Sequence, residues 1–223
     1  MARKILLICG ILSSLLYVGT DILAAMCYKG YSYTAQTISE LSAIGAPTRP
    51  LVVPLYLAYD VLLIAFGLGI WTSDRRTRAV RFTARLLGGI GVIGLVAPFP
   101  MHMRGAGLTL TDTMHIIVMG GIALVILLTI GVGANAFGKR FRLYSIVTIV
   151  VLVMGGTFTG LNAAQVAANL PTPWIGVAER INVYGFMLWI AVLAVALLRA
   201  RDSAATDHVG RRSDSGLVAK PAA

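Results

Sequence analysis

Charged residues are scarce in this sequence. They make up 13% of its 223 residues, whereas hydrophobic residues make up 57%. A soluble domain of this length needs far more polar surface, so the composition excludes that class of protein. The chain is therefore expected to lie in a lipid bilayer.

Cysteine and histidine are also rare. The two cysteines, Cys9 and Cys27, fall near opposite ends of one apolar run. A helix rises 1.5 Å per residue, so they would lie about 27 Å apart, too far for a disulfide. The three histidines form no HExxH motif, so no motif fixes the geometry of a metal site.

Long hydrophobic runs are what the sequence has in abundance. A hydrocarbon core about 30 Å thick needs about 20 apolar residues per helical span. Six runs of that length occur: 5–27, 51–71, 82–101, 113–134, 143–164 and 181–198. The predicted fold class is all-α, a six-transmembrane-helix bundle with short loops. We expect this domain to cover residues 1–200, followed by a disordered cytoplasmic tail over 201–223 that has no apolar face.

Acidic residues are few, which leaves a net charge of +10. The basic residues gather by loop rather than on one face with aromatic residues, so we expect no nucleic-acid partner. Of the 19 basic residues, 15 fall on one side of the predicted spans, and Lys29, Arg49, Arg104 and Arg180 fall on the other. This bias predicts a multi-pass protein of the plasma membrane with both termini in the cytoplasm.

The stretch TISELSAIGAPTRP, residues 37–50, connects the first two spans. Thr37 followed three residues later by Glu40 is typical of a capping box. Gly45 and Pro47 then end the helix. A short interfacial helix is therefore predicted between spans one and two. Glu40 is either only a cap, or a carboxylate needed for its charge, which would then hold a cation or pair with Arg49 or Arg180.

Polar residues converge at the predicted outer ends of the spans. Asp112 and His115 lie three residues apart at a helix start and so share a face, and His102 ends the third span at the same level. The candidate ligand-binding residues there are Glu40, Arg49, Asp112, His115, Glu179 and Arg180.

Three interpretations of this group remain open. Asp112 and His115 are candidate metal ligands and would make the protein a metal-dependent membrane hydrolase. Arginines among carboxylates can instead bind a lipid headgroup or a small anion. The third interpretation is a network of caps and ion pairs that only steadies the loops.

Asp60 is different because it lies midway along the second span, where a charge costs about 3 kcal/mol. We expect its side chain to face the bundle interior, protonated or paired, with Tyr56, Asn162 and Gln165 as possible partners. It is either a neutral carboxyl that joins two helices or the proton site of a proton-coupled transporter.

Four motifs in order resemble a known family: ISELSAIGAPTRP after the first span, FP closing the third, TDTMH opening the fourth, and ERINVYGFMLW entering the sixth. Over Ile5 to Leu198 the chain is similar to prokaryotic six-span membrane proteins classed as domain of unknown function 998. The resemblance implies family-type positions at Ser39, Glu40, Leu41, Gly45, Pro47, His115, Glu179 and Arg180, and it implies no activity or cofactor.

The sequence therefore predicts a multi-pass integral membrane protein. Its expected partner is the lipid bilayer, with a lipid headgroup or small anion as possible ligand at an outer-facing polar site. Ser39 joins that candidate site through the resemblance.

Overall fold

The computed structural model describes residues 1–73, 77–97 and 100–217, with side chains described up to residue 201. Arg75, Arg76, Phe99 and Lys220, on which predictions of charge or motif rest, lie outside the described residues. All regular secondary-structure elements of the described residues are helices. The elements are α1 (Ala2–Cys27), η1 (Ile38–Ser42), α2 (Arg49–Trp71), α3 (Arg78–Val96), α4 (Leu110–Gly133), α5 (Lys139–Leu161), α6 (Ala163–Ala167) and α7 (Ile175–Leu217).

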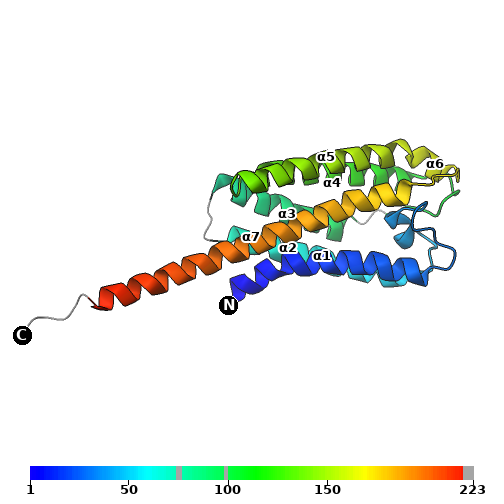
Figure 1. The fold of residues 1–223 in the computed structure, drawn as a ribbon. Coiled ribbons are helices and arrows are strands. Elements are labelled where there is room, and N and C mark those ends of the chain that lie inside the picture. Colours follow the sequence, from blue (N-terminus) through cyan, green and yellow to red (C-terminus); the bar gives the residue numbers. More distant parts are fainter. Residues whose placement is uncertain (74–76, 98–99, 218–223) are drawn as a thin grey trace, which may run out of the picture.

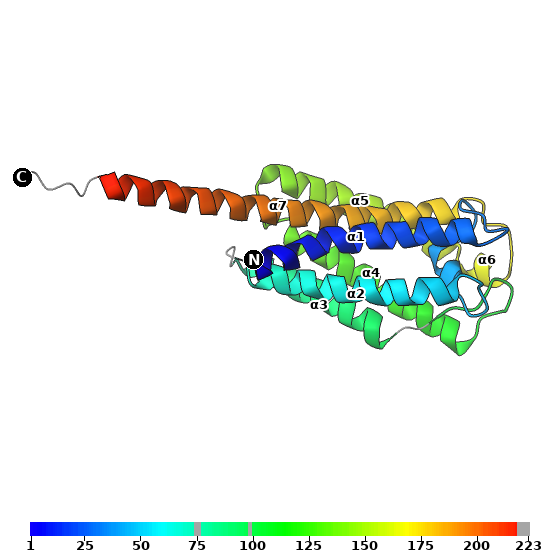
Figure 2. The same ribbon diagram turned by 90° about the horizontal axis from the view of Figure 1, so that it is seen from below.

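The six long helices form a closed ring. Each packs against the next in the order α1, α2, α3, α4, α5 and α7, and α7 returns to pack against α1. The bundle therefore has an inner end, where α1 begins and beyond which α7 continues, and an opposite end that carries η1 and α6 (Figures 1 and 2). We call the end with η1 and α6 the outer end.

The helix boundaries shift slightly from the predicted spans. The third span, α3, begins at Arg78 and ends at Val96. The sixth span belongs to α7, which begins at Ile175, six residues before the predicted start of that span. α7 continues past the bundle to Leu217 (Figure 1). Part of the stretch 201–223 is thus helical in backbone, and the predicted disorder of that tail stays a prediction.

The apolar core occupies the half of the bundle that lies toward the inner end. Trp189 of α7 is fully buried at its centre, and its indole N–H donates to Ser145 Oγ of α5 at 3.0 Å. Gly133 of α4 admits this ring, since a Cβ there would lie 2.7 Å from Trp189. Burial of such a large aromatic side chain is worth several kcal/mol, so this residue fastens three helices together.

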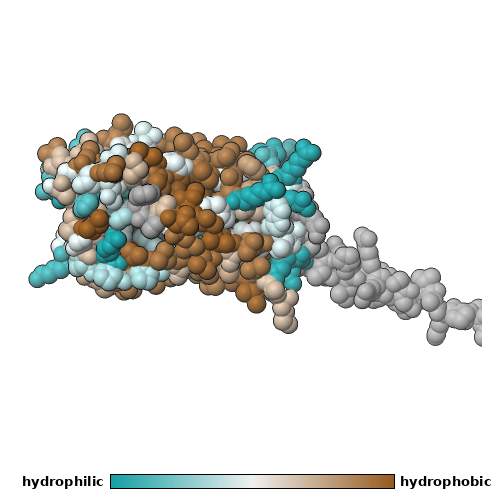
Figure 3. Space-filling model, turned by 180° about the vertical axis from the view of Figure 1, so that it is seen from behind, coloured by the Kyte–Doolittle hydropathy of each residue, from teal (hydrophilic) through white to brown (hydrophobic). Residues whose placement is uncertain are grey.

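An apolar belt surrounds the bundle. Each long helix leaves large apolar side chains exposed, for example Leu15, Leu68, Val92, Leu124, Val150 and Leu188. Figure 3 shows this belt as a brown band between two more polar ends. In the part of the chain that the structure describes, six helices are long and apolar enough to cross a membrane, so the belt matches the surface that a bilayer would cover. The structure confirms the predicted all-helical, six-span fold class.

Candidate functional site

The segment around η1 folds as its sequence predicts, although the helix is of the 3-10 type. The Thr37 N–H donates to Glu40 Oε2 at 2.7 Å, which is the capping interaction expected from their spacing. Gly45 adopts a left-handed φ of 92°, which favours glycine, and it ends the segment. The Ile44 N–H then donates to the Met101 carbonyl at 2.8 Å, which joins this segment to the connection between α3 and α4.

Glu40 is also half of a buried ion pair. Its partner is Arg104, with N–O distances of 2.8 and 3.0 Å, whereas Arg49 and Arg180 were the expected partners. Arg49 instead donates to the Ser42 carbonyl. Arg104 further donates to Thr172 Oγ1 and to the Ala35 carbonyl, both at 2.9 Å. One guanidinium therefore joins three connections at the outer end.

This environment changes the acidity of Glu40. Burial alone raises the pKa of its carboxyl, but hydrogen bonds from Arg104, Thr37 and Gln36 outweigh that effect. The pKa therefore falls below its ordinary value of 4.5. Glu40 is consequently ionised at neutral pH and stabilises the charge of Arg104.

A second buried ion pair joins the ends of two spans. Arg180 of α7 donates twice to Asp21 of α1, both at 2.9 Å, and both residues are almost fully buried. The guanidinium also lies 3.5 Å from the centre of the Tyr33 ring and donates to the Tyr31 hydroxyl at 2.7 Å. Asp21 was missing from the predicted site. Its position near the outer end of the first span, level with Arg180, was the available signal.

A glycine brings α7 close enough for these contacts. A Cβ at Gly176 would lie 2.3 Å from the Gln36 carbonyl oxygen and 2.5 Å from that of Tyr33. The Gly176 N–H donates to the Thr34 carbonyl at 2.9 Å. The connection from α1 to η1 is thus held directly against the start of α7.

Glu179 has a different set of partners. Its carboxylate accepts hydrogen bonds from the Ile38 N–H and, at 3.4 Å, from the Ser39 hydroxyl. Among the described residues no basic side chain forms an ion pair with it. It is half-buried, so it is not sealed inside the protein. The structure therefore brings the predicted residues Ser39, Glu40, Glu179 and Arg180 together around η1.

Asp112 lies in a separate cluster at the start of α4. It accepts hydrogen bonds from the His102 N–H at 2.6 Å and from the Thr109 hydroxyl at 2.6 Å, and its carboxylate lies 3.2 Å from His102 Nδ1. His115 is half-buried one turn further along α4. Within the described part of the chain, no group of three or more His, Cys, Asp or Glu side chains could hold a metal ion.

Asp60 faces the interface between α2 and α3, in the middle of the span. It is 7% exposed, and its side chain packs directly against Gly94 of α3. A Cβ added to Gly94 would lie only 2.4 Å from the carboxyl oxygens of Asp60. None of the described residues donates a hydrogen bond to it. Tyr56, its expected partner, has a buried hydroxyl without a hydrogen-bond partner among the described residues.

The fold defines a multi-pass membrane protein of six helices whose outer end is held by two buried ion pairs. Residues 11–196 match the model of the family described as Protein of unknown function (DUF998), and the chain belongs to that family. Comparison with curated proteins and with solved structures found no match.

Proposed function

We propose that this protein of the plasma membrane binds the amine-bearing headgroup of a membrane lipid at its outward-facing end, with Glu179 as the carboxylate that contacts the amine. The observation that supports this proposal is that no basic side chain among the described residues forms a direct ion pair with Glu179, on which Arg180 acts only through space. The excess of basic residues at the inner end supports the outward orientation.

Glu179 is the carboxylate near η1 that has no ion pair among the described residues, which favours a cation as ligand. Asp21, Glu40 and Glu179 supply three carboxylates there, and Arg49, Arg104 and Arg180 supply three guanidinium groups. Arg104 and Arg180 are each paired with a carboxylate and largely buried, and Arg49 donates to the Ser42 carbonyl. The proposed ligand is still a lipid headgroup, as the sequence suggested. The part that the protein recognises is now its cationic amine instead of an anionic group.

The depth of Glu179 favours a lipid as the source of that cation. The residue lies one turn inside the start of α7, whose 175–201 segment is long and apolar enough to span a membrane. Exposed apolar residues flank it, with Trp174 63% and Ile181 51% exposed. Amphipathic Trp near a helix end is typical of the headgroup level of a bilayer.

The two ion pairs give η1 a fixed position above this carboxylate. Arg104 fixes Glu40 on one side of the segment, and Arg180 fixes the connection that precedes it through the Tyr33 and Gln36 carbonyls. The Ile38 N–H and the Ser39 hydroxyl therefore reach Glu179 from a rigid support. Such support reduces the entropy that binding would otherwise cost.

Lipid analysis of purified protein tests this proposal. We expect phosphatidylethanolamine to co-purify above its share of the membrane with the parent, and this enrichment to disappear in Glu179→Gln, which keeps the shape and the Ile38 hydrogen bond. Asp112→Asn, a carboxylate change in the separate cluster, is the matched control and should keep the enrichment. Equal enrichment in the parent and Glu179→Gln would refute the proposal.

Asp60 supports a second candidate function, a proton-coupled carrier. A buried carboxyl in the middle of a span, without a described hydrogen-bond donor, is a residue that could bind and release a proton. In vesicles with an imposed pH gradient, the parent should then pass protons and Asp60→Asn should not. Equal proton flux in the two proteins would remove this candidate.

A further inference from the structure

A row of three arginines lies at the inner end of α3. Arg78, Arg81 and Arg85 are spaced by three and four residues, so they share one face of the helix. All three are exposed, and no carboxylate of the described residues forms an ion pair with any of them. Together with Phe82 and Val132 they line a cavity of about 460 Å³.

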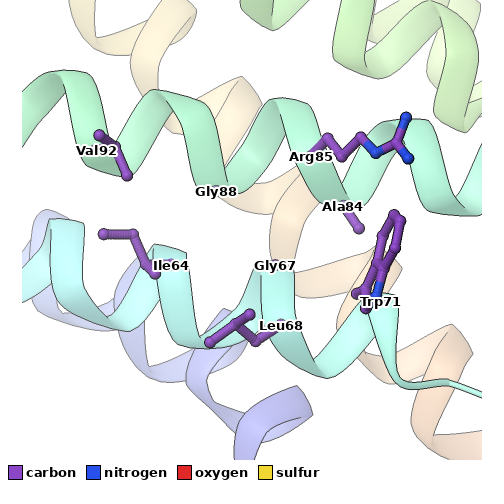
Figure 4. Close-up of a pocket in the computed structure, with 8 residues that line it drawn as sticks. All are labelled: Ile64, Gly67, Leu68, Trp71, Ala84, Arg85, Gly88 and Val92. Carbon is purple, nitrogen blue, oxygen red and sulfur yellow. The ribbon is translucent and has the colours of Figure 1, made fainter.

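An apolar groove continues from this row toward the middle of α2 and α3. It runs between α2 and α3, has a volume of about 200 Å³, and is walled by Ile64, Leu68 and Val92 (Figure 4). The groove exists because α2 and α3 carry glycines, Gly67 and Gly88, where they face each other. The two helices are so close here that a Cβ at Gly67 would lie 2.9 Å from the Ala84 carbonyl oxygen. Gly88 also lines it, and a Cβ there would meet no atom within 4 Å.

The arginine row and the groove meet at Arg85, which lines both. Figure 4 shows its guanidinium beside the ring of Trp71, and the two lie 4.8 Å apart. Arg81 lies 5.5 Å from the same ring. The tryptophan therefore holds two positive charges at the mouth of an apolar groove, at the end of the span.

We infer that this surface binds an anionic phospholipid, with the phosphate at Arg81 and Arg85 and one acyl chain in the groove between α2 and α3. Unpaired guanidinium groups hold phosphate oxygens through paired, charge-assisted hydrogen bonds. Basic pockets between membrane helices are suited to anionic headgroups. The apolar groove supplies the contact that distinguishes a lipid from a free phosphate ion. This inference concerns the inner end and does not rest on the function proposed for the outer end.

Two variants separate the contributions of headgroup and chain. Arg81→Gln/Arg85→Gln removes the charges, and we expect it to weaken binding of phosphatidylglycerol by about tenfold or more, since a charge-assisted hydrogen bond is worth about 1.5 kcal/mol or more. Gly88→Leu places a side chain in the groove at a position where a Cβ meets no atom within 4 Å, and it should weaken binding of the same lipid. The measurement is native mass spectrometry of the full chain in detergent, titrated with phosphatidylglycerol.

Matched controls keep the test specific. Arg140→Gln/Arg142→Gln changes two exposed basic residues at the same end, and Gly120→Leu adds a side chain to α4 where a Cβ also meets nothing within 4 Å. Both should bind phosphatidylglycerol as the parent does, and phosphatidylcholine and inorganic phosphate should bind the parent weakly. The inference is overturned if phosphatidylcholine or inorganic phosphate binds equally well, or if neither test variant differs from its control.

Discussion

Glu40 illustrates how one carboxylate can serve both local and long-range structure. It caps η1 through the Thr37 N–H and also neutralises Arg104, a residue 64 positions further along the chain. A cap that is lost to alanine costs about 1 kcal/mol, whereas a buried ion pair that loses one partner costs about 3 kcal/mol or more. The second role therefore dominates the effect of any change that removes the charge.

Glu40→Gln is the variant that separates these roles, because glutamine still caps a helix. We expect this variant to lose about 3 kcal/mol of stability in detergent, since it leaves Arg104 buried without its counter-charge. The double variant Glu40→Gln/Arg104→Gln should lose less than the sum of the two single changes. Parent-like stability of Glu40→Gln would show that Glu40 is only a cap.

The same residue predicts a dependence on pH. Its pKa is lowered in the folded protein, so its contribution is present above the ordinary value of 4.5 and is lost as pH falls through the folded pKa. The difference in thermal stability between the parent and Glu40→Gln should stay constant above about pH 5 and shrink below pH 4.5. A difference that grows as the pH falls would contradict this assignment.

At the scale of elements, the crossing of α2 and α3 depends on glycines of α3. A Cβ at Gly91 would lie 2.7 Å from the backbone carbonyl of Asp60, and one at Gly94 would lie 2.4 Å from the Asp60 carboxyl. The backbone contact can be relieved only by moving a helix, whereas the carboxyl contact can be relieved by shortening a side chain. The two glycines should therefore respond differently to changes at Asp60.

We expect Gly91→Ala and Gly94→Ala each to destabilise the bundle, by about 1–3 kcal/mol, as overpacking does. Combination with Asp60→Ala should relieve the loss in Gly94→Ala and leave the loss in Gly91→Ala. Thermal unfolding of the four variants in one detergent measures this difference. Equal relief for both glycines would mean that the carboxyl of Asp60 does not face Gly94.

The elements also show which features sequence reasoning could reach. The six spans and η1 follow from patterns within about 20 residues or fewer, namely apolar runs and the Thr37–Glu40 spacing. The ion pairs join residues 64 and 159 positions apart. Opposite charges at one membrane level offer several possible pairings, and only the ring order of the helices selects Arg104 for Glu40 and Asp21 for Arg180. Local patterns therefore predicted that Glu40 and Arg180 belong to the site, but they did not predict Arg104 and Asp21 as their partners.

At the scale of the whole molecule, the ring order places the start of α1, the end of α2, the connection 134–138 and the continuation of α7 beyond the bundle at one end. The basic residues concentrate there, so we expect reporters fused after Trp71, after Asn135 and at the C-terminus to be cytoplasmic. Reporters near Gly30, Gly105 and Thr172 should be external. A C-terminal tail that protease removes from intact cells would contradict this orientation.

This orientation would place the carboxylate of Glu179 at the outer headgroup level and the arginine row of α3 at the inner level. The two ends would then differ in the sign of the lipid charge that they bind. An amine at one end and a phosphate at the other would suit a protein whose ends contact the two leaflets of one bilayer.

The role proposed for Glu179 is tested most directly by comparing the affinity of the purified protein for short-chain phosphatidylethanolamine with its affinity for the N-acetylated form, which lacks the positive charge. We predict that the parent binds the amine form about tenfold more tightly or better, as expected for a hydrogen bond between charged groups, and that Glu179→Gln binds both forms alike. A parent that binds both forms with equal affinity, or a Glu179→Gln variant that keeps the preference, would contradict it.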